Sequence, residues 1–378
     1  MFTSFLICCT VVLFLCPTLV WLLCWIVARL CHHAMPFAPF AYAGLALVLL
    51  FIGTILYGYW FGRFQLRVQP TTYTSPQVPA AFNGYKIVHI SDLHLSSFAD
   101  SPTFLQRVID TINAQQPDLI CFTGDFVGFG VEEAIPFTNM LRQLRAKDGI
   151  MSVLGNHDFA LYHHGLTDEQ KEQKVEQLTA YQRDTLGWHL LRNQSYIISR
   201  NTAHLQIIGV DNTSCQGQGF QTISRGDLPK AMSSLNQEKR TKSQDISVTT
   251  EQTEVISLDS LFLAPKSKIM QILLSHDPSH WRGEVVPTTD IPLTLSGHTH
   301  AGQVRLFGYP LSSLMFTESE GWYHTTPHDT TLHNTTPHDT TLHHTTQSLY
   351  INTGIGCTLP VRLGVPAEIT VITLQNNQ

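Results

Sequence analysis

Acidic, amide and imidazole side chains recur in short clusters that each follow an apolar segment. The clusters are Asp92-Leu93-His94, Gly124-Asp125, Gly155-Asn156-His157-Asp158, Ser275-His276-Asp277 and Gly297-His298-Thr299-His300. Some clusters alone are ordinary, since Gly-Asp is a routine turn and a single histidine is most often a satisfied core residue. Gly155-Asn156-His157-Asp158 is harder to dismiss, because three polar residues directly after an apolar segment need partners. Jointly they indicate a metal site. Neutral imidazole together with carboxylate suits Zn, Fe or Mn, whereas a pure carboxylate cage would suit Mg or Ca.

The apolar segments before the first three clusters predict strands that alternate with helices. We expect strands at 85–92, 117–125 and 149–158, and helices at 101–115, 131–146 and 167–186. Strands that alternate with helices of this length form βαβ units with parallel pairing. The carboxyl ends of such strands are where ligands bind in open α/β sheets. The clusters therefore stand where a site would form.

The second half of the chain predicts more strands, at 196–200, 203–210, 269–275, 291–296, 303–307, 348–353 and 368–374. The last of these are joined by short turns or an irregular insert, which favours antiparallel pairing or a second sheet. Two segments look inserted. Residues 236–259 are polar and aperiodic, and residues 325–334 recur with one difference as 335–344. The histidines of this repeat suggest weak metal binding, but we favour a slipped duplication in a surface loop.

In this order the clusters resemble the D-x-H, G-D, G-N-H-[D/E], H and G-H-x-H motifs of the calcineurin-like metallophosphoesterases. The resemblance covers about residues 84–375 and includes the segments GQVRLFGY, LYINTGIG and VRLGVPAEITVITL. It is strongest with the membrane-anchored bacterial branch. It implies an α/β fold, the four-layer αββα sandwich of two packed sheets flanked by helices. The βαβ pattern by itself supports only the first of those sheets.

The resemblance also implies a role for each residue of the clusters. Its metal ligands are Asp92, His94 and His300 for one divalent ion, Asn156, His276 and His298 for a second, and Asp125 as a bridge between them. Two such ions, Mn, Fe or Zn, polarise a phosphoryl group and lower the pKa of a water toward neutrality. His157 would not bind metal but would stabilise or protonate the leaving oxygen. Asp158 would orient a histidine.

One departure from the family bears on the substrate. Its Ser/Thr protein phosphatases continue the second motif as G-D-x-x-D-R-G, whereas residues 126–130 here are Phe-Val-Gly-Phe-Gly. Without that acid and arginine, a phosphoprotein substrate fits poorly. We expect a membrane-anchored phosphohydrolase that cleaves phosphoester or pyrophosphate bonds. The resemblance favours a lipid-linked substrate such as UDP-diacylglucosamine, because some relatives cleave that pyrophosphate. The alternatives are a tethered general or cyclic-nucleotide phosphodiesterase and a non-catalytic scaffold, which would not need His157.

The amino-terminal residues have the composition of a membrane segment. Residues 4–28 and 36–62 contain no charge, and each run exceeds the roughly 20 apolar residues that cross the hydrocarbon layer. The first run lacks a basic start and is longer than the apolar core of a signal peptide. We expect two transmembrane helices, the alternative being one span and a buried helix. Tyr57, Tyr59 and Trp60 would lie at the interface.

Charge is distributed unevenly along the 378 residues, of which 43% are apolar and 14% charged. Residues 1–90 hold four of the 23 basic residues and none of the 29 acidic ones, so the remainder carries a net charge of −10. A domain this acidic is a poor partner for nucleic acid. Arg63 and Arg67 follow the second span and favour a cytoplasmic domain.

These observations predict a multi-pass protein of the cell membrane in three parts. A membrane segment at 1–63 is followed by a linker at 64–84, rich in Pro, Thr and Gln, and by a metallophosphoesterase domain at 85–378. Only Cys121, Cys215 and Cys357 lie in that domain, and an odd, widely spaced set does not form a disulfide framework. Nothing in the sequence predicts an oligomeric state.

Overall fold

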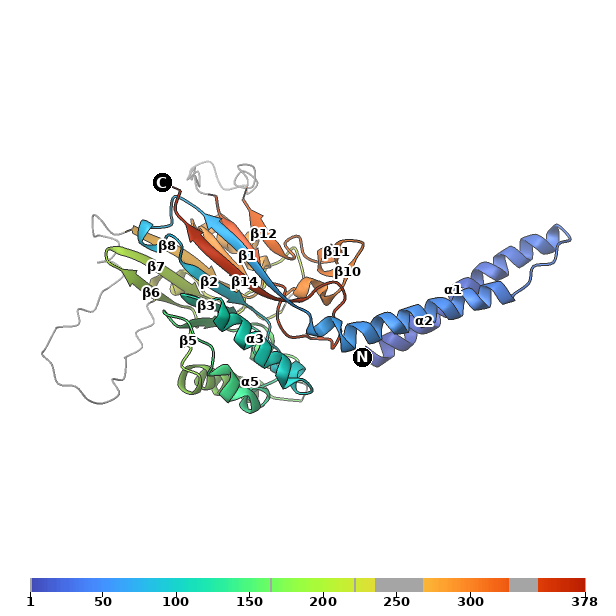
Figure 1. Cartoon of the computed structure of the whole chain (residues 1–378), viewed down its shortest axis with the longest axis horizontal. Coiled ribbons are helices and arrows are strands. Elements are labelled where there is room, and N and C mark those ends of the chain that lie inside the picture. Colours follow the sequence, from blue (N-terminus) through green and yellow to red (C-terminus); the bar gives the residue numbers. More distant parts are fainter. Residues whose placement is uncertain (1, 164, 221, 235–267, 326–345, 378) are drawn as a thin grey trace, which may run out of the picture.

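The computed structural model describes residues 2–163, 165–220, 222–234, 268–325 and 346–377 (Figure 1). The polar stretch at 236–259 and all but the first residue of the repeat at 325–344 lie outside the described residues. In the described part, a pair of long helices projects from one end of a domain built on two sheets (Figure 1).

The projecting pair consists of α1 (Phe2–Leu30) and α2 (Ala38–Trp60), which run antiparallel (Figure 1). Both helices are long and apolar enough to cross a membrane. Gly44 lets them approach closely, because a Cβ added there would lie 3.1 Å from the carbonyl oxygen of Phe14. Most of their large apolar side chains face outward. An apolar surface of this extent is typical of a membrane-associated segment.

The first sheet has the order β1-β14-β2-β3-β4-β5. Its strands are β1 (Leu66–Thr74), β2 (Lys86–Ile90), β3 (Leu119–Thr123), β4 (Ile150–Val153), β5 (His189–Leu190) and β14 (Ala367–Gln375). β2, β3, β4 and β5 pair in parallel, and β14 runs antiparallel to β2. The crossovers between the parallel strands contain the helices α3 (Pro102–Ala114), α4 (Thr138–Leu141) and α5 (Asp168–Ala180).

The second sheet has the order β12-β13-β9-β8-β7-β6. Its strands are β6 (Gln194–Arg200), β7 (Ala203–Gly209), β8 (Lys268–Leu274), β9 (Leu293–Ser296), β12 (Gly321–His324) and β13 (Ser348–Ile351). The four inner strands pair in parallel, whereas β6 and β12 are antiparallel edges. The carboxyl ends of β8 and β9 therefore share one edge of this sheet.

Three apolar clusters bind these elements into four layers. The first lies between α3, α5 and the first sheet, the second between the two sheets, and the third between the second sheet and its outer helices. Those outer helices are α6 (Leu228–Ser233), the π-helical turn η8 (Trp281–Val285) and α8 (Val286–Thr288). Alternation along β2 illustrates the arrangement, since Val88 faces the helices while Ile87 faces the other sheet. The αββα sandwich is therefore confirmed.

The prediction of a linker over 64–84 is wrong in its first half. Residues 66–74 form β1, which pairs in parallel with β14 along its whole length. The Pro/Thr/Gln content concealed the strand, but Pro70 is tolerated because β1 is an edge strand. Leu66 and Val68 pack against the first apolar cluster. The anchor is thus joined to the domain by a strand of the sheet rather than by free chain.

Other element boundaries also differ from prediction. The helix expected at 131–146 is broken into short turns and α4, because Pro136 cannot donate a backbone hydrogen bond and interrupts the helix. The strand expected at 303–307 is reduced to β10 (Arg305–Leu306), which forms a small separate hairpin with β11 (Tyr309–Pro310). The edge strands β5 and β12 were not predicted. They are only two and four residues long.

Candidate metal centre

Five strand ends bring the eight predicted side chains together. The contributions are Asp92 and His94 after β2, Asp125 after β3, Asn156 and His157 after β4, His276 after β8, and His298 and His300 after β9. All eight are buried except His157 and His298, which are half-buried. The first sheet supplies five of them and the second supplies three. The site therefore exists only where the carboxyl edges of both sheets meet.

One group of side chains joins Asp92, His94 and His300. The Nε2 atom of His300 lies 3.3 Å from Oδ1 of Asp92 and 3.1 Å from Nε2 of His94. The Nε2 atom of His94 is 4.0 Å from the same Asp92 oxygen. Three ligand atoms this close together can hold one metal ion.

A second group forms around His276. Its Nε2 atom lies 3.1 Å from Oδ1 of Asn156 and 3.2 Å from Nδ1 of His298. Asp125 stands between the two groups, since its Oδ2 atom is 3.3 Å from Nε2 of His276 and 3.5 Å from Nε2 of His94. This is the position that a bridging carboxylate requires. Asp125, His276 and His298 can also hold a metal ion as a set.

The backbone is strained at five of the seven residues that make up the two groups and the bridge between them. Five residues have a left-handed φ between 41° and 71°, which non-glycine residues rarely adopt: Asp92, His94, Asp125, His298 and His300. Such strain clusters at functional sites and persists only where the surrounding structure enforces it. Glycine gives the carboxylate room, because a side chain at Gly155 would collide with Asp125. The preceding Gly124 has a φ of 91°, which suits glycine.

Neighbouring groups orient the ligand atoms. The Nδ1–H of His276 donates to the carbonyl oxygen of Thr123 at 2.6 Å, which leaves Nε2 free to face the site. The amide nitrogen of Asn156 donates to the hydroxyl of Tyr162 at 3.0 Å, so its Oδ1 atom turns toward His276. These hydrogen bonds hold the donor atoms in place before any ion arrives.

Burial and charge act on the pKa values in opposite ways across the site. Burial raises the pKa of Asp92 to about 7, and the charge of Asp125 adds to the rise. Burial lowers the pKa of His94 to about 3 and also lowers the pKa of His300. For His276, burial is outweighed by the Asp125 carboxylate, which raises its pKa to about 10. A cation bound here would replace the proton on His276 and neutralise the buried carboxylates.

Asp92 shows that the site fits a metal ion. Its Oδ1 atom is buried and has no hydrogen-bond partner among the described residues, although it faces His94 and His300. A buried acceptor without a partner is costly, and a metal ion ligated by these atoms would remove the cost. Imidazole, carboxylate and amide donors together suit first-row divalent ions.

His157 lies beside the two groups. Its ring centroid is 4.8 Å from that of His94 and 4.4 Å from that of Tyr162. The Nδ1–H of His157 can donate to the carbonyl oxygen of Gly128 at 3.3 Å, and its backbone N–H donates to Asp125 at 2.9 Å. With Asp125 and His94 it forms a third set able to hold metal, so its predicted role as a non-ligand stays a prediction.

The expectation for Asp158 is wrong. Among the described residues its carboxylate bonds no histidine but accepts the backbone N–H groups of Phe126, Val127 and Gly155 at 2.9–3.1 Å. Asp158 lies in the short 3-10 turn His157–Phe159 that follows β4. It therefore ties the loop after β3 to the loop after β4, and these two loops carry Asp125 and Asn156.

Arg362 was missed by sequence reasoning. It is fully buried, and its Nη2 atom donates to the carbonyl oxygens of Thr353, Gly354 and Gly356 at 2.6–3.1 Å. The same atom lies 3.4 Å from Nδ1 of His300. Arg362 thereby holds the loop that packs behind His300. Its only signal in the sequence is a lone charge within the apolar, glycine-containing segment VRLGVP.

A cleft of about 1120 Å³ opens over the site. Asp125, Asn156, His157, His298 and His300 are among its lining residues. Its walls are mostly apolar and are formed by Leu161, Tyr162, Phe220, Ile223, Leu311, Met315, Phe316 and Leu359. Leu311 belongs to the turn η10 (Leu311–Leu314), and Met315 is the next residue. No lysine or arginine belongs to the described lining of this cleft.

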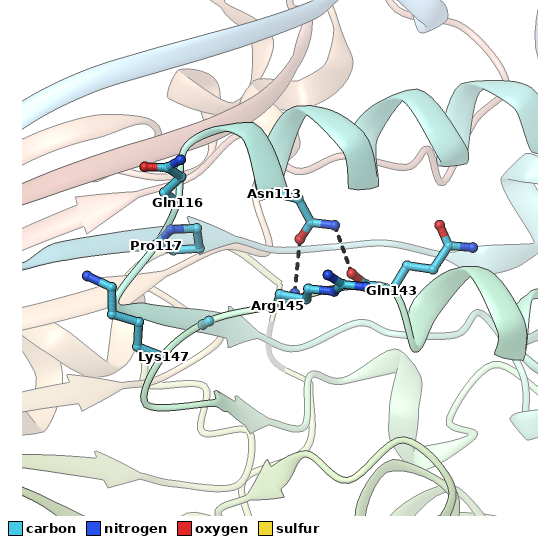
Figure 2. Close-up of a pocket in the computed structure, with 7 residues that line it drawn as sticks. Asn113, Gln116, Pro117, Gln143, Arg145 and Lys147 are labelled. Carbon is cyan, nitrogen blue, oxygen red and sulfur yellow. Dashed lines mark hydrogen bonds between the residues drawn. The ribbon is translucent and has the colours of Figure 1, made fainter.

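A second pocket lies at the opposite edge of the first sheet (Figure 2). Pro117 and Lys147 precede β3 and β4, so this pocket stands at the amino ends of the strands, remote from the candidate metal centre. The side chain of Asn113 links two lining residues of this pocket: it donates to the carbonyl oxygen of Gln143 at 2.7 Å and accepts from the backbone N–H of Arg145 at 2.9 Å (Figure 2). Its described lining holds no cluster of metal ligands.

Comparison with known proteins agrees with this geometry. The sequence profile described as calcineurin-like phosphoesterase matches residues 85–302, which include every residue of the candidate centre. The chain belongs to this family. It is therefore a hydrolase of phosphoester bonds that depends on a dinuclear metal centre, and the His/Asp groups described above can hold such ions.

Curated relatives in the family include membrane proteins. The chain is 28% identical to the uncharacterized metallophosphoesterase YkuE of Bacillus subtilis, over 84% of this chain and 90% of that protein. It is 24% identical to a Danio rerio transmembrane protein with metallophosphoesterase domain, over 79% of this chain and 55% of that protein. A shorter stretch, 26% of this chain, is 40% identical to 30% of the UDP-2,3-diacylglucosamine pyrophosphatase LpxG of Chlamydia trachomatis.

Proposed function

We propose that the chain is a membrane-tethered phosphohydrolase that cleaves a phosphodiester or pyrophosphate bond in an amphipathic, lipid-linked substrate. The cleft carries this proposal, because metal-ligand side chains and many large apolar side chains line it together. Such a cleft suits a phosphate group attached to an apolar body. The partial similarity to LpxG supports a pyrophosphate of the UDP-diacylglucosamine type.

The assignment of ligands matches the two groups. We assign Asp92, His94 and His300 to one ion, Asn156, His276 and His298 to the other, and Asp125 to both. Divalent ions, when bound, polarise the phosphoryl group and activate a water for attack on phosphorus. Mn, Fe and Zn all suit these donors. The protein's part is to hold the ligand atoms rigidly, through the strained strand ends and the bond from His276 to Thr123.

His157 is assigned to the leaving group. The bond from its Nδ1–H to Gly128 leaves Nε2 as the atom that can carry a second proton. The ring lies among the residues lining the cleft and beside the first group of ligands. From there it protonates the departing oxygen or stabilises its charge.

The decisive experiment is a substrate panel on the full chain in detergent with Mn²⁺. Bis-p-nitrophenyl phosphate reports phosphodiesterase activity, and UDP-2,3-diacylglucosamine is compared with a UDP-sugar that lacks acyl chains and with cyclic nucleotides. We expect the acylated substrate to have the highest kcat/KM. Preference for cyclic nucleotides would favour the tethered phosphodiesterase instead, and absence of all turnover would favour a scaffold.

We propose further that α1 and α2 both cross the membrane and that the domain faces the cytoplasm. Arg63 and Arg67 lie just after the second helix, which supports this side. A periplasmic-type reporter, active only outside the cytoplasm, should stay silent when fused after Gln378. The same reporter placed in the loop between the helices, at His33, should be active. The reverse pattern would reverse the orientation, and two silent fusions would contradict two spans.

A further inference from the structure

The β10–β11 hairpin and the turn η10 carry a cluster of exposed apolar side chains. Phe307 is 99% exposed, Leu314 83%, Tyr309 75% and Leu306 51%. These four residues, here called the hairpin patch, lie within nine positions of one another in the chain. Soluble surfaces rarely gather so many large apolar side chains in one place unless something covers them.

Phe307 occupies the tip of the hairpin against its own backbone preference. Its φ is 51° and that of Gly308 is 90°, which is the two-residue turn with both φ values positive. Such turns normally take Asn-Gly or Asp-Gly. An aromatic residue in this conformation costs backbone energy, yet the ring is exposed and gains no burial against the described residues in return. Contact with a partner outside the described residues would offset this cost.

The hairpin adjoins the segment that packs on α2. The backbone N–H of Arg305 donates to the carbonyl oxygen of Leu363 at 2.8 Å. Val361 and Leu363 in turn contact α2 at Gly58, where an added Cβ would lie 2.6 Å from the Val361 side chain. Figure 1 shows β10 and β11 at the end of the domain from which α1 and α2 project.

The length of α2 places this contact at the membrane surface. The helix, Ala38–Trp60, has 23 residues. At about 1.5 Å per residue it is longer than the hydrocarbon layer of about 30 Å. The last turns, with Tyr57, Tyr59 and Trp60, therefore lie among the lipid headgroups. Gly58 belongs to these turns, so the segment packed against it, and the hairpin beside that segment, lie at the same level.

We propose that the hairpin patch docks into the lipid surface next to α2 and holds the domain against the bilayer. The proposal rests on α1 and α2 crossing the membrane, and not on the identity of the substrate. Lipid is the occupant because the patch continues the membrane surface of the anchor. Arg305, which precedes Leu306 of the patch, does not oppose contact with lipid, because its guanidinium group pairs with Glu320 at 2.5 Å.

Docking would bring the mouth of the cleft to the bilayer. Leu314 belongs to the patch, whereas Leu311 in the same turn and Met315 next to it line the cleft. One short segment thus joins the proposed lipid contact to the catalytic cleft. An apolar substrate could pass from the bilayer to the metal centre along this segment with little exposure to water.

The first test uses the full chain reconstituted in vesicles of phosphatidylcholine and phosphatidylglycerol. A photoreactive diazirine amino acid replaces Phe307, and a matched control replaces Asn201, an exposed residue in the β6–β7 turn at the far end of the domain from α2 (Figure 1). After irradiation we expect lipid adducts at 307 and none at 201. Adducts to a second copy of the chain, or no lipid adducts at 307, would overturn the proposal.

The second test removes the ring without harming the turn. Phe307→Asn places a residue that favours this turn at the tip, so thermal unfolding should be unchanged or shifted upward. With the diazirine now at position 314, lipid adducts should fall by about tenfold, the effect of losing one buried aromatic side chain. Unchanged adducts at 314 would contradict docking.

A third measurement separates this proposal from the proposed function. Hydrolysis of bis-p-nitrophenyl phosphate by Phe307→Asn should equal that of wild type, because Phe307 does not line the cleft. If wild type lacks this activity but gives lipid adducts at 307, the proposed function fails and the docking stands. If wild type is active without such adducts, the docking fails alone.

Discussion

The two sheets contribute to the metal centre in different ways. The first sheet brings Asp92, Asp125 and Asn156 together through three consecutive parallel strands, each joined to the next by a crossover. The second sheet adds His276, from β8, and the two histidines that come after β9. From β2 to β5, strands that are neighbours along the chain are neighbours in the first sheet, and the same holds from β6 to β9 in the second. The second sheet reaches the site only because the two sheets pack face to face.

Neither sheet holds a complete ligand group. Asp92 and His94 come from the first sheet and meet His300 from the second, while Asp125 from the first meets His276 from the second. Each proposed ion would therefore bind both sheets at once. The ligands would then also connect the two sheets. Substitutions at the metal centre should therefore alter the free energy of unfolding as well as turnover.

Asp125→Asn should have the largest effect, because Asp125 lies 3.5 Å from His94 and 3.3 Å from His276 and so joins both groups. Loss of an outer hydrogen-bond partner of a metal ligand costs roughly 10–100-fold, and loss of the bridging ligand itself should exceed that. Elemental analysis should show less than two ions per chain, and turnover of bis-p-nitrophenyl phosphate should nearly vanish.

Asp118→Asn is the matched control. Asp118 stands just before β3, as Asp125 stands just after it, and pairs with Lys147 at 2.6 Å. This control should lose some stability but keep both ions and its turnover. Normal metal content and activity in Asp125→Asn would show that the ligand assignment is wrong.

His157→Ala should have the next largest effect and should not affect the connection between the sheets. A positioned acid contributes about 10²–10⁴ in rate. We expect this loss for alkyl phosphodiesters, whose leaving oxygen needs a proton, and a smaller loss for p-nitrophenyl esters. Metal content and thermal unfolding should match wild type. Equal losses for all leaving groups would indicate charge stabilisation, and loss of an ion would show that His157 is a ligand.

The sequence could predict the half of the site that local rules govern. Asp92, Asp125 and Asn156 were visible as polar residues directly after apolar strands, at the edge where open sheets bind ligands. The later strands indicated a second sheet only as an alternative to antiparallel pairing. The roles of His276 and His298, like those of the other ligands, came from the resemblance to a family, since packing between sheets leaves no periodic signal. Arg362 and Tyr162 were missed for the same reason. Their partners, Gly356 and Asn156, are defined only by the folded chain.

Metal removal should loosen the contact between the sheets. Ligand that binds only the folded state stabilises it by about 2.7 kcal/mol at a hundredfold excess over Kd, which corresponds to a rise in Tm of about 4–5 °C for a domain of roughly 300 residues. We expect chelation to lower the Tm of the full chain in detergent by that amount. Asp125→Asn should respond less. An unchanged Tm in wild type would mean that the ions do not connect the sheets.

The smallest effect concerns His89, which is fully buried between the two sheets with its ring against Tyr350 of β13. Burial lowers the pKa of His89 to about 3 from an ordinary value of 6.5, and the ring bonds the hydroxyl of Thr123 at 2.9 Å. The folded chain thus keeps this ring neutral at pH values where the unfolded chain protonates it. Above pH 6.5 neither state is charged there, so His89 has no effect on stability. Below it, the unfolded state gains a proton and the fold loses stability as the pH falls.

The expected loss between pH 6 and pH 5 is about 1 kcal/mol from this one ring. His89→Gln removes the titrating group and keeps a hydrogen-bonding side chain, so its unfolding free energy should fall less steeply over the same interval, although its stability at pH 8 is lower. Urea denaturation of both proteins at each pH, in detergent with saturating Mn²⁺, isolates the difference, because every other group titrates in both. Parallel curves would mean that His89 reaches water, and that the contact between the sheets is looser than its burial indicates.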